Sequence, residues 1–556
     1  MLRHALGVAL SALVWLQPPA LLPLPSRTGP EGSPRPYGFE PPPGPQAPRT
    51  NAALARAQTN AMLYGPFPAA GLTRGVSEGT LLDSEAAAVR SLAVTRIREA
   101  GASVVRIPVD WRSTVAEDPP ASFNASDPGS VDYRFAPIDA AVISAVSAGL
   151  TPLLVVSHAP GFAEASPRWP YAYPGSWAPS PAALGEFATA LARRYDGSFP
   201  DPQAPGGVLP RVMLFQAWNE PNLTRYLEPQ WVVEEGRWVA FSPLLYREML
   251  NGFYAGVKSV DPSDTVIAAG LAPNGDPEGV GRMQPVRFLK ELFCLRPRAD
   301  GRAGARRAPL TSCPQPPHFD VLAFHPLSVG DPNAAARSSL DVSISDAAKV
   351  TGLLTQAEHL GTALPRHVKP VWVTELNWES APQTPHGVPP ALQAQWVSRA
   401  LHRLWVAGVS LVAWQFLVDP YPGVRAETPT GGIVEYPRSA GLYSAGTAGN
   451  PESAQPKTFL QGFSFPFDPL RVSAKTVRVW ALLMHPRQAV LLQRERHAGG
   501  AWRTAASLRA NRYGVLNALV SLRGAVRLRL QSGGLVSRVA AVPVGRSPLD
   551  AGHSRG

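Results

Sequence analysis

The chain has 556 residues, more than one hydrophobic core usually holds, so we expect one large domain and a smaller one. Hydrophobic residues at 45% and charged residues at 17% are typical of a globular protein and exclude an intrinsically disordered chain.

Residues 1–24 are predicted to be a signal peptide or an N-terminal anchor. Arg3 precedes an apolar run at 5–16 that is too short to span a bilayer, for which about 20 residues are needed. No small-x-small cleavage site follows, so a cleaved signal and an uncleaved anchor both remain open. Residues 25–54 are rich in Pro and Gly and suit an extended linker. We therefore expect a secreted or extracytoplasmic protein.

Seven continuous apolar runs recur between residues 102 and 419, at intervals of roughly 40 to 60 residues. They include LTPLLVVSHAP, RVMLFQAWNEP and KPVWVTELNW. Runs of this kind fit strands of a parallel sheet that is buried on both faces. Helices are predicted between them, at 84–100 and from the start signals Ser180-Pro181 and Ser242-Pro243.

A weaker strand before Ser84 completes eight βα units, so the sequence predicts a (β/α)8 TIM barrel over residues 55–467. An open doubly wound sheet is the alternative, although it would require a Gly-rich turn after its first strand.

Two carboxylates stand at predicted strand ends. Glu220 lies in WNEPN after the fourth strand, and Glu375 lies in TELNW at the seventh. Barrel enzymes place their sites at the C-terminal ends of the strands, so these two can face each other across the mouth. Glycoside hydrolysis with retention uses two carboxyl groups about 5–5.5 Å apart.

WNEPN and TELNW, in this order, resemble the clan A retaining glycoside hydrolases, nearest family 39 or family 5 (cellulase-like). The resemblance covers roughly residues 55–467 and implies hydrolysis of a β-linked oligo- or polysaccharide. It implies that Glu220 is the acid/base and Glu375 the nucleophile, and that Asn219 hydrogen-bonds the sugar 2-hydroxyl. The charge of Glu375 would help to keep Glu220 protonated. No cofactor is expected, and without CxxC or HExxH no metal is expected either.

Further substrate-binding candidates come from other strand ends. Arg106 could hydrogen-bond the nucleophile, or form only a structural ion pair. His158 and His325 could hold sugar hydroxyls or orient Glu375, although a lone histidine is usually structural. The tryptophans are Trp414, as a platform under the sugar ring, and Trp218 and Trp378 as weaker candidates.

Three other functions stay open at this point. A transglycosidase would use the same intermediate, with a sugar acceptor replacing water. A non-hydrolytic glycan-binding envelope protein would not need both carboxylates. An esterase is suggested by GVSEG around Ser77, but the next helix begins too late for a nucleophile elbow.

Cys294 and Cys313 are the two cysteines, and in an exported chain a disulfide between them is favoured over two free thiols.

Residues 468–546 read as a small all-β accessory module of short strands separated by Gly and polar turns. Residues 470–546 carry 13 Arg and 1 Lys against one acid, Glu495, a net +13, while the rest of the chain carries −2. Such a charge favours an anionic envelope polymer as partner, unless it is only a solvated surface. Nucleic acid is not expected, because no aromatic stacking platform accompanies the arginines. We expect a monomer.

Overall fold

The computed structural model describes residues 60–295, 313–328, 330–384, 387–420, 425–427, 433–435 and 439–544. The predicted signal peptide or anchor and the predicted linker lie outside the described residues. Within the described part of the chain, no helix combines the length and the apolar character needed to cross a membrane.

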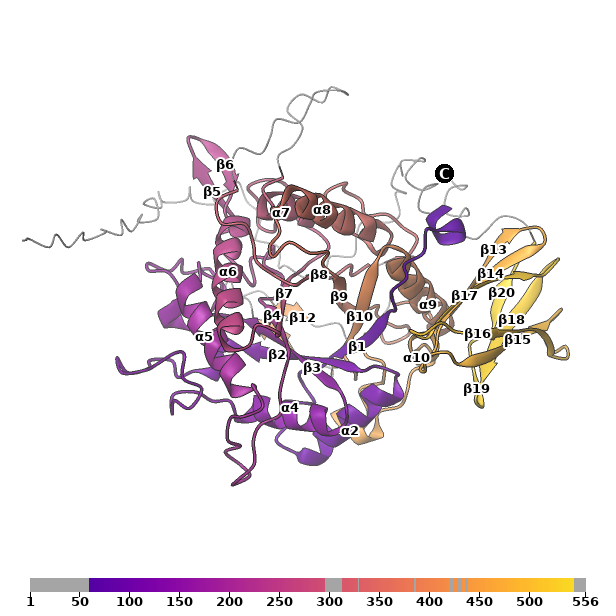
Figure 1. Cartoon of the computed structure of the whole chain (residues 1–556), viewed down its shortest axis with the longest axis horizontal. Coiled ribbons are helices and arrows are strands. Elements are labelled where there is room, and N and C mark those ends of the chain that lie inside the picture. Colours follow the sequence, from indigo (N-terminus) through magenta and orange to yellow (C-terminus); the bar gives the residue numbers. More distant parts are fainter. Residues whose placement is uncertain are drawn as a thin grey trace, which may run out of the picture.

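Eight parallel strands close into a barrel in the order β1-β10-β9-β8-β7-β4-β3-β2 (Figure 1). Their bounds are Thr73–Ser77 (β1), Val104–Asp110 (β2), Thr151–Ser157 (β3), Leu214–Ala217 (β4), Thr265–Leu271 (β7), Val321–Phe324 (β8), Val371–Leu376 (β9) and Val409–Gln415 (β10). Since β1 pairs with both β2 and β10, the sheet has no edge. The closure confirms the predicted TIM barrel and excludes the open doubly wound sheet.

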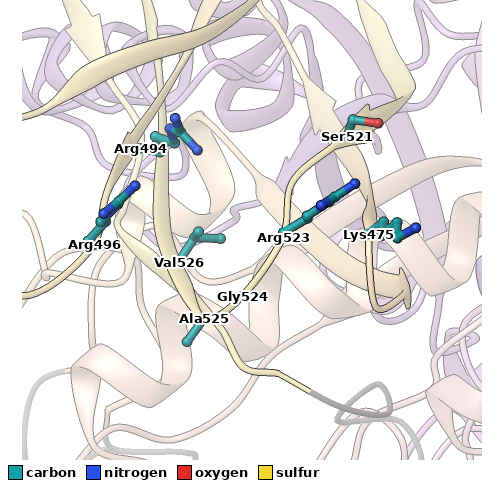
Figure 2. A pocket seen from close by; sticks show the side chains of 8 residues that line it. All are labelled: Lys475, Arg494, Arg496, Ser521, Arg523, Gly524, Ala525 and Val526. Atoms are coloured by element: carbon teal, nitrogen blue, oxygen red, sulfur yellow. The ribbon is translucent and has the colours of Figure 1, made fainter.

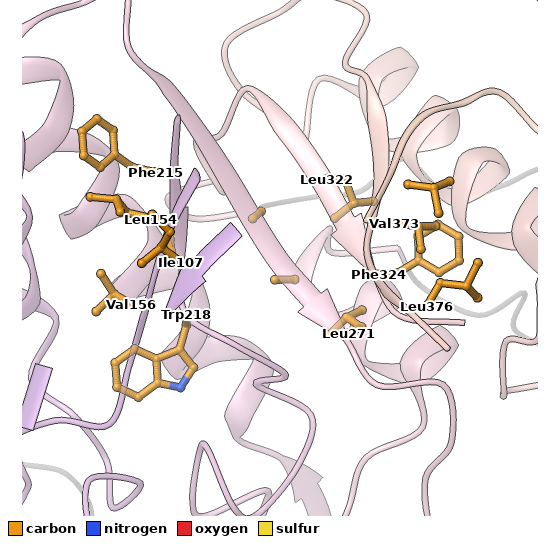
Figure 3. Close-up of a cluster of buried hydrophobic side chains, with 14 of the residues drawn as sticks. Ile107, Leu154, Val156, Phe215, Trp218, Leu271, Leu322, Phe324, Val373 and Leu376 are labelled. Atoms are coloured by element: carbon orange, nitrogen blue, oxygen red, sulfur yellow. The ribbon is translucent and has the colours of Figure 1, made fainter. Parts of the chain in front are cut away.

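The barrel strands are continuously apolar because both of their faces are buried. Outward side chains such as Ile107, Phe215 and Val373 pack into one large cluster with the helices (Figure 3). Inward side chains such as Leu153 and Ile267 form a smaller cluster of strand residues alone. Side chains therefore alternate between the helix layer and the barrel interior, and this alternation decides which residues reach the barrel mouth.

Helices cover the outside of the barrel (Figure 1). Their bounds are Ala87–Glu99 (α2), Trp111–Thr114 (α3), Ala136–Ser147 (α4), Pro181–Arg194 (α5), Ser242–Val260 (α6), Pro285–Leu292 (α7), Ala347–Leu360 (α8), Pro390–Val406 (α9) and Leu460–Ser464 (α10). The Ser180 hydroxyl caps α5 by accepting from the Ala183 N–H, as predicted. Ser242 opens α6 but does not cap it, because its hydroxyl donates to Gln230.

In the parts of the connections that the structure describes, there are two hairpins and four short 3-10 turns. The hairpins are Trp231–Glu234 (β5) with Arg237–Ala240 (β6), and Arg425–Glu427 (β11) with Ile433–Glu435 (β12). The turns are Gly161–Ala163 (η1), Ile344–Asp346 (η2), Thr447–Gly449 (η3) and Pro451–Ser453 (η4). A disulfide joins Cys294 to Cys313 with their Cα atoms 5.7 Å apart, which confirms the predicted pairing.

The C-terminal module is all-β, as predicted. Its strands are Phe467–Ser473 (β13), Thr476–Leu482 (β14), Ala489–Glu495 (β15), Arg503–Arg509 (β16), Val515–Ser521 (β17), Val526–Ser532 (β18), Leu535–Val536 (β19) and Ala540–Val542 (β20). One sheet has the order β13-β14-β17; the other has the order β16-β15-β18-β19, with β20 paired to β18. A separate apolar core of residues from both sheets holds the module together.

The module lies beside α9 and α10 of the barrel (Figure 1). Asp468 of β13 is fully buried there and accepts hydrogen bonds from the Arg399 Nε, at 2.8 Å, and from the His402 Nδ1, at 2.8 Å. Burial would raise the pKa of Asp468, but the charge of Arg399 and the contact with His402 hold it well below its usual range. The His402 ring also stacks on Trp480 of β14. A buried charge cluster therefore joins barrel and module.

Candidate active site

A layer of polar side chains lies at the C-terminal ends of the barrel strands, beyond the inward apolar cluster. Its buried members are Ser77, Arg106, Gln216, Asn219, Glu220, His325, Thr374 and Glu375. Arg106 and Gln216 are there because they stand two residues after the inward Val104 and Leu214 on their own strands. His325 directly follows β8, two residues after the inward Ala323, and Ser77 stands two residues after Gly75, which pairs with the inward Ala413.

Glu375 reaches the interior through a β-bulge. In the pairing of β9 with β10, Val373 is opposite Val412 and Leu376 is opposite Trp414, so β9 holds one extra residue between these pairs. Val373 and Leu376 both belong to the outer cluster, and Thr374 and Glu375 lie between them. Bulges are known to redirect side chains beside active sites. The bulge thus brings two successive residues to the barrel mouth where a regular strand would bring one.

The WNEPN segment holds Glu220 in a strained loop after β4. Trp218 has φ 74° and Glu220 has φ 41°, left-handed values that cost of order 1 kcal/mol or more for a residue with a side chain. Asn222 fixes the loop: its Nδ2 donates to the carbonyls of Ala272 and Met283, and its Oδ1 accepts from the Ala272 N–H. These contacts hold the loop in the conformation that turns Glu220 toward the barrel mouth.

Arg106 connects both halves of the site. Its Nη1 donates to Glu375 Oε1 at 2.7 Å, and its Nη2 donates to Asn219 Oδ1 at 2.6 Å. Its Nε donates to Gln216 and its Nη1 also to Ser77. The Arg106 side chain is 3% exposed and that of Glu375 is 9% exposed, so the ion pair is largely buried. The predicted contact between Arg106 and Glu375 is present in the structure.

Glu220 faces Glu375 with His325 beside them. One ring nitrogen of His325 and one carboxylate oxygen from each glutamate all lie within 4.8 Å of one another. Burial raises the pKa of Glu220 to about 7, although the charges of Arg106 and Arg225 oppose the shift. The charge of Glu375 was expected to keep Glu220 protonated; in the structure, burial is the cause of the raised pKa.

His325 is bonded to Glu220 and not to Glu375. Its Nδ1 lies 2.9 Å from Glu220 Oε1 and 3.8 Å from Glu375 Oε2, and its Nε2 lies 2.9 Å from the Thr374 hydroxyl. The prediction named Glu375 as the carboxylate that His325 orients, but the hydrogen-bonded partner is Glu220. Burial lowers the pKa of His325 to about 4, against the charge of Glu375, so the ring is neutral at neutral pH.

The same three side chains could in principle hold a metal ion, since His and carboxylate are metal ligands. The Arg106 guanidinium already bonds Glu375, and its positive charge opposes a second cation beside it. His325 Nδ1 is likewise engaged by Glu220. These three residues are therefore better suited to acid–base chemistry, with two carboxyl groups of different proton affinity, than to binding a metal ion.

None of the three candidate tryptophans offers a ring face at the barrel mouth. Trp414 is fully buried against Phe459 and Phe463 of the helix layer, because it follows the inward Ala413 and so points outward. The platform role predicted for Trp414 is therefore wrong. Trp378 is buried against Trp414 and donates to the Gly330 carbonyl.

Trp218 is also fully buried and serves the loop. Its left-handed backbone turns the indole into the outer cluster, where Figure 3 shows it near Val156, and its Nε1 donates to the Tyr226 carbonyl. Trp218 and Trp378 are thus structural residues rather than sugar contacts.

His158 forms a separate cluster nearer the solvent. Its Nδ1 lies 3.0 Å from Asp110 Oδ2, and its ring stacks on Tyr226 with the centroids 5.2 Å apart. Burial alone would raise the pKa of Asp110, but the hydrogen bond and charge of His158 lower it. A direct sugar contact by His158 stays a prediction; the structure shows a half-exposed polar cluster at the ends of β2 and β3.

Several site residues were missed by sequence reasoning. Gln216 bonds Arg106, Thr374 bonds His325, and Asp110 bonds His158. Gln216 could have been found from the sequence, because it stands two residues after the inward Leu214 on β4. Gly270, with φ 73°, stands at a second bulge, in β7, and a Cβ there would lie 2.6 Å from Gln216 and 2.9 Å from His325. Only glycine leaves room for these side chains.

Ser77 does not form a nucleophile elbow. It ends β1, and α2 begins only at Ala87. Its hydroxyl accepts a hydrogen bond from Arg106. The esterase alternative is therefore excluded by the geometry that its motif requires.

Solved structures with a similar fold include glycoside hydrolases. A family 39 glycoside hydrolase from the gut symbiont Bacteroides cellulosilyticus WH2 is 16% identical, with 82% of this chain and 81% of that chain covered and a TM-score of 0.46. A monomeric β-xylosidase from Caulobacter crescentus CB15 is 13% identical, with 84% and 98% covered and a TM-score of 0.43. An endo-β-1,4-mannanase from Thermotoga petrophila is 14% identical, with 87% and 99% covered and a TM-score of 0.38.

No family model matches the sequence, and no curated protein matches it. At these identities and TM-scores, the barrel is identified by its own strand pairing, and the chemistry of the site by its own side chains.

Proposed function

We propose that this chain is a retaining glycoside hydrolase that cleaves a β-linked oligo- or polysaccharide, with Glu220 as acid/base and Glu375 as nucleophile. The observation that carries the proposal is the environment of the two carboxyl groups. They face each other within 4.8 Å, and one is buried with a pKa near 7 while the other bonds a guanidinium. Two carboxyl groups with different environments can take different roles at one pH.

In the first step the Glu375 carboxylate attacks the anomeric carbon while Glu220 gives its proton to the glycosidic oxygen. The bond from that oxygen to the anomeric carbon breaks, the leaving sugar departs as an alcohol, and an ester to Glu375 remains. In the second step the Glu220 carboxylate takes a proton from water, and the resulting hydroxide displaces Glu375. Two inversions give net retention.

The neighbouring residues support each role. Arg106 binds one Glu375 oxygen and holds Asn219 by its Oδ1, and within the described residues no partner is found for the Asn219 Nδ2. That N–H group is placed to donate to a sugar hydroxyl. His325, with its proton on Nδ1, donates to Glu220 Oε1 whether Glu220 is charged or neutral, and its Nε2 accepts from the Thr374 hydroxyl. The catalytic proton is then carried by the other oxygen of Glu220.

The test is product analysis on a panel of β-linked glycans with wild type, Glu220→Gln, Glu375→Gln and an exposed control, Glu117→Gln. Mass spectrometry identifies the products, and proton NMR identifies the anomer formed first. Cleavage with retention by wild type and by the control, lost in both site variants, is the expected result. An inverted first product would overturn the nucleophile role of Glu375, and undiminished cleavage by either site variant would overturn the assignment.

The same assay separates the two alternatives. Products longer than the substrate, formed at high acceptor concentration, would identify a transglycosidase. Glycan bound equally by all four proteins, with none cleaved, would identify a binding protein.

A further inference from the structure

A cationic pocket of about 620 Å³ lies in the C-terminal module, where three segments of chain meet (Figure 2). These are the turn between β13 and β14, the end of β15 with the residue after it, and the connection from β17 to β18. The lining residues are Lys475, Arg494, Arg496, Ser521, Arg523, Gly524, Ala525 and Val526. The volume is within the range of small-molecule pockets, about 300–1,000 Å³.

The four cations of this pocket have no carboxylate partner among the residues that the structure describes. Glu495 is the one acid in residues 470–546, and it is buried and paired with Arg527, which does not line the pocket. Asp468, the other acid of the module, is buried against Arg399 and His402 of the barrel. Like charges that converge without counter-ions repel one another, so an anion that enters the pocket relieves this repulsion.

The pocket is built on a rigid support. Arg471 of β13 is 2% exposed, and its guanidinium donates to the carbonyls of Leu522 and Gly524, on either side of Arg523, and to that of Pro543. These contacts fix the β17–β18 connection and thereby place Arg523. A bound anion would therefore meet a preorganised group rather than a free surface loop.

The arrangement of the cations indicates an extended ligand. Figure 2 shows Arg494 and Arg496 on one side, Arg523 and Lys475 on the other, and Val526 between them. Two cationic sides separated by neutral residues match a ligand with two or more separated anionic groups on an uncharged body. Arginine forks pair bidentately with carboxylate and phosphate groups alike, and carboxylate is chosen here because a glycan is the substrate class of the proposed function.

We propose that this pocket binds a segment of an acidic polysaccharide through its carboxylate groups, and so retains the enzyme on a uronate-bearing polymer. The anion pocket stands on its own geometry, but the choice of a glycan as its ligand rests on the proposed glycosidase function. The pocket gathers four of the fourteen cations of residues 470–546 in one place.

The test uses the full chain with Glu375→Gln as background, so that binding is measured without turnover. The probe is a fluorescent oligogalacturonate, compared with a neutral oligosaccharide of equal length and with inorganic polyphosphate. The pocket variants are Arg496→Gln/Arg523→Gln and Lys475→Gln/Arg494→Gln, each of which removes one cation from either side. The matched control, Arg487→Gln/Arg512→Gln, removes the same charge from the opposite end of the module, beyond the far end of β14.

We expect oligogalacturonate to bind, the neutral probe not to bind, and each pocket variant to weaken binding at least about tenfold per lost charge-assisted contact, with the control within about threefold of the background. Equal losses in pocket and control variants would overturn the pocket and leave a diffuse charge effect. No binding of oligogalacturonate, or binding of polyphosphate alone, would overturn the ligand class.

The unmutated enzyme is assayed separately on the neutral members of the panel of β-linked glycans. Activity without pocket binding refutes this proposal alone, and pocket binding without glycosidase activity refutes the proposed function alone.

Discussion

Replacement of the Glu220 carboxyl by an amide tests the link between burial and catalysis. With a pKa of about 7, about three quarters of the molecules carry the Glu220 proton at pH 6.5, against about 1% for a carboxyl group at the ordinary 4.5. Burial thus supplies roughly 75-fold more of the acid form at that pH. We expect kcat/KM of wild type to fall about tenfold per pH unit above pH 7, because this parameter reports the free enzyme.

For Glu220→Gln we expect kcat/KM on unactivated glycosides to fall by about 10²–10⁴, which is about 3–5 kcal/mol of transition-state stabilisation. The basic limb of the pH profile should vanish with the carboxyl. Glycosides with an activated aryl leaving group need little protonation, so their first step should survive, and azide should restore turnover because it attacks without losing a proton. The assay is kcat/KM from pH 5 to 9 on both substrate classes.

Two results would refute this reasoning. If the basic limb persists in Glu220→Gln, another group titrates near pH 7. If both substrate classes slow equally and azide has no effect, Glu220 is not the acid/base.

Three further changes have defined outcomes. Arg106→Gln leaves Glu375 as a buried charge without its partner, so we expect the free energy of unfolding to fall by about 3–5 kcal/mol and kcat/KM by about 10²–10³, measured by urea unfolding and steady-state kinetics. Asp468→Asn should cost a similar 3–5 kcal/mol at pH 7. Because the folded pKa of Asp468 lies below its unfolded value near 3.8, this contribution is present above pH 4, and the difference from wild type in urea unfolding should shrink as the pH falls toward 2. Cys294→Ser/Cys313→Ser opens a loop with a sequence separation of 19 and should cost about 3 kcal/mol in the same assay.

Each of these has a matched control. Arg106→Lys keeps the positive charge but cannot donate to Glu375 and Asn219 at once as the guanidinium does. An activity equal to wild type would contradict the role of the hydrogen bond to Asn219. Asp261→Asn removes an exposed ion pair with Arg211, which solvent screens, so its loss in urea unfolding should be much smaller than that of Asp468→Asn; an equal loss would show that burial is not the cause. Chemical reduction of wild type should reproduce the double serine variant.

The sequence by itself determined the elements and their order. Continuous apolar runs at a regular interval identify strands buried on both faces, and start signals such as Ser180-Pro181 identify the helices between them, because these patterns depend on local conformation and burial. The positions of Glu220 and Glu375 at strand ends follow from the same pattern. The disulfide could be predicted because only two cysteines occur.

Only the tertiary structure decided where the side chains at the barrel mouth point. The bulge in β9 turns Glu375 inward, and the left-handed backbone turns Trp218 outward. Neither orientation follows from the alternation of side chains along a regular strand. Trp414 is different, since regular alternation already places it outside.

Proton affinities, the true partner of His325 and the cationic pocket likewise depend on contacts between residues far apart in the sequence. Local sequence indicates which segments form strands and helices. Burial and the meeting of distant charges, which set the chemistry, exist only once the barrel has closed and the module has packed.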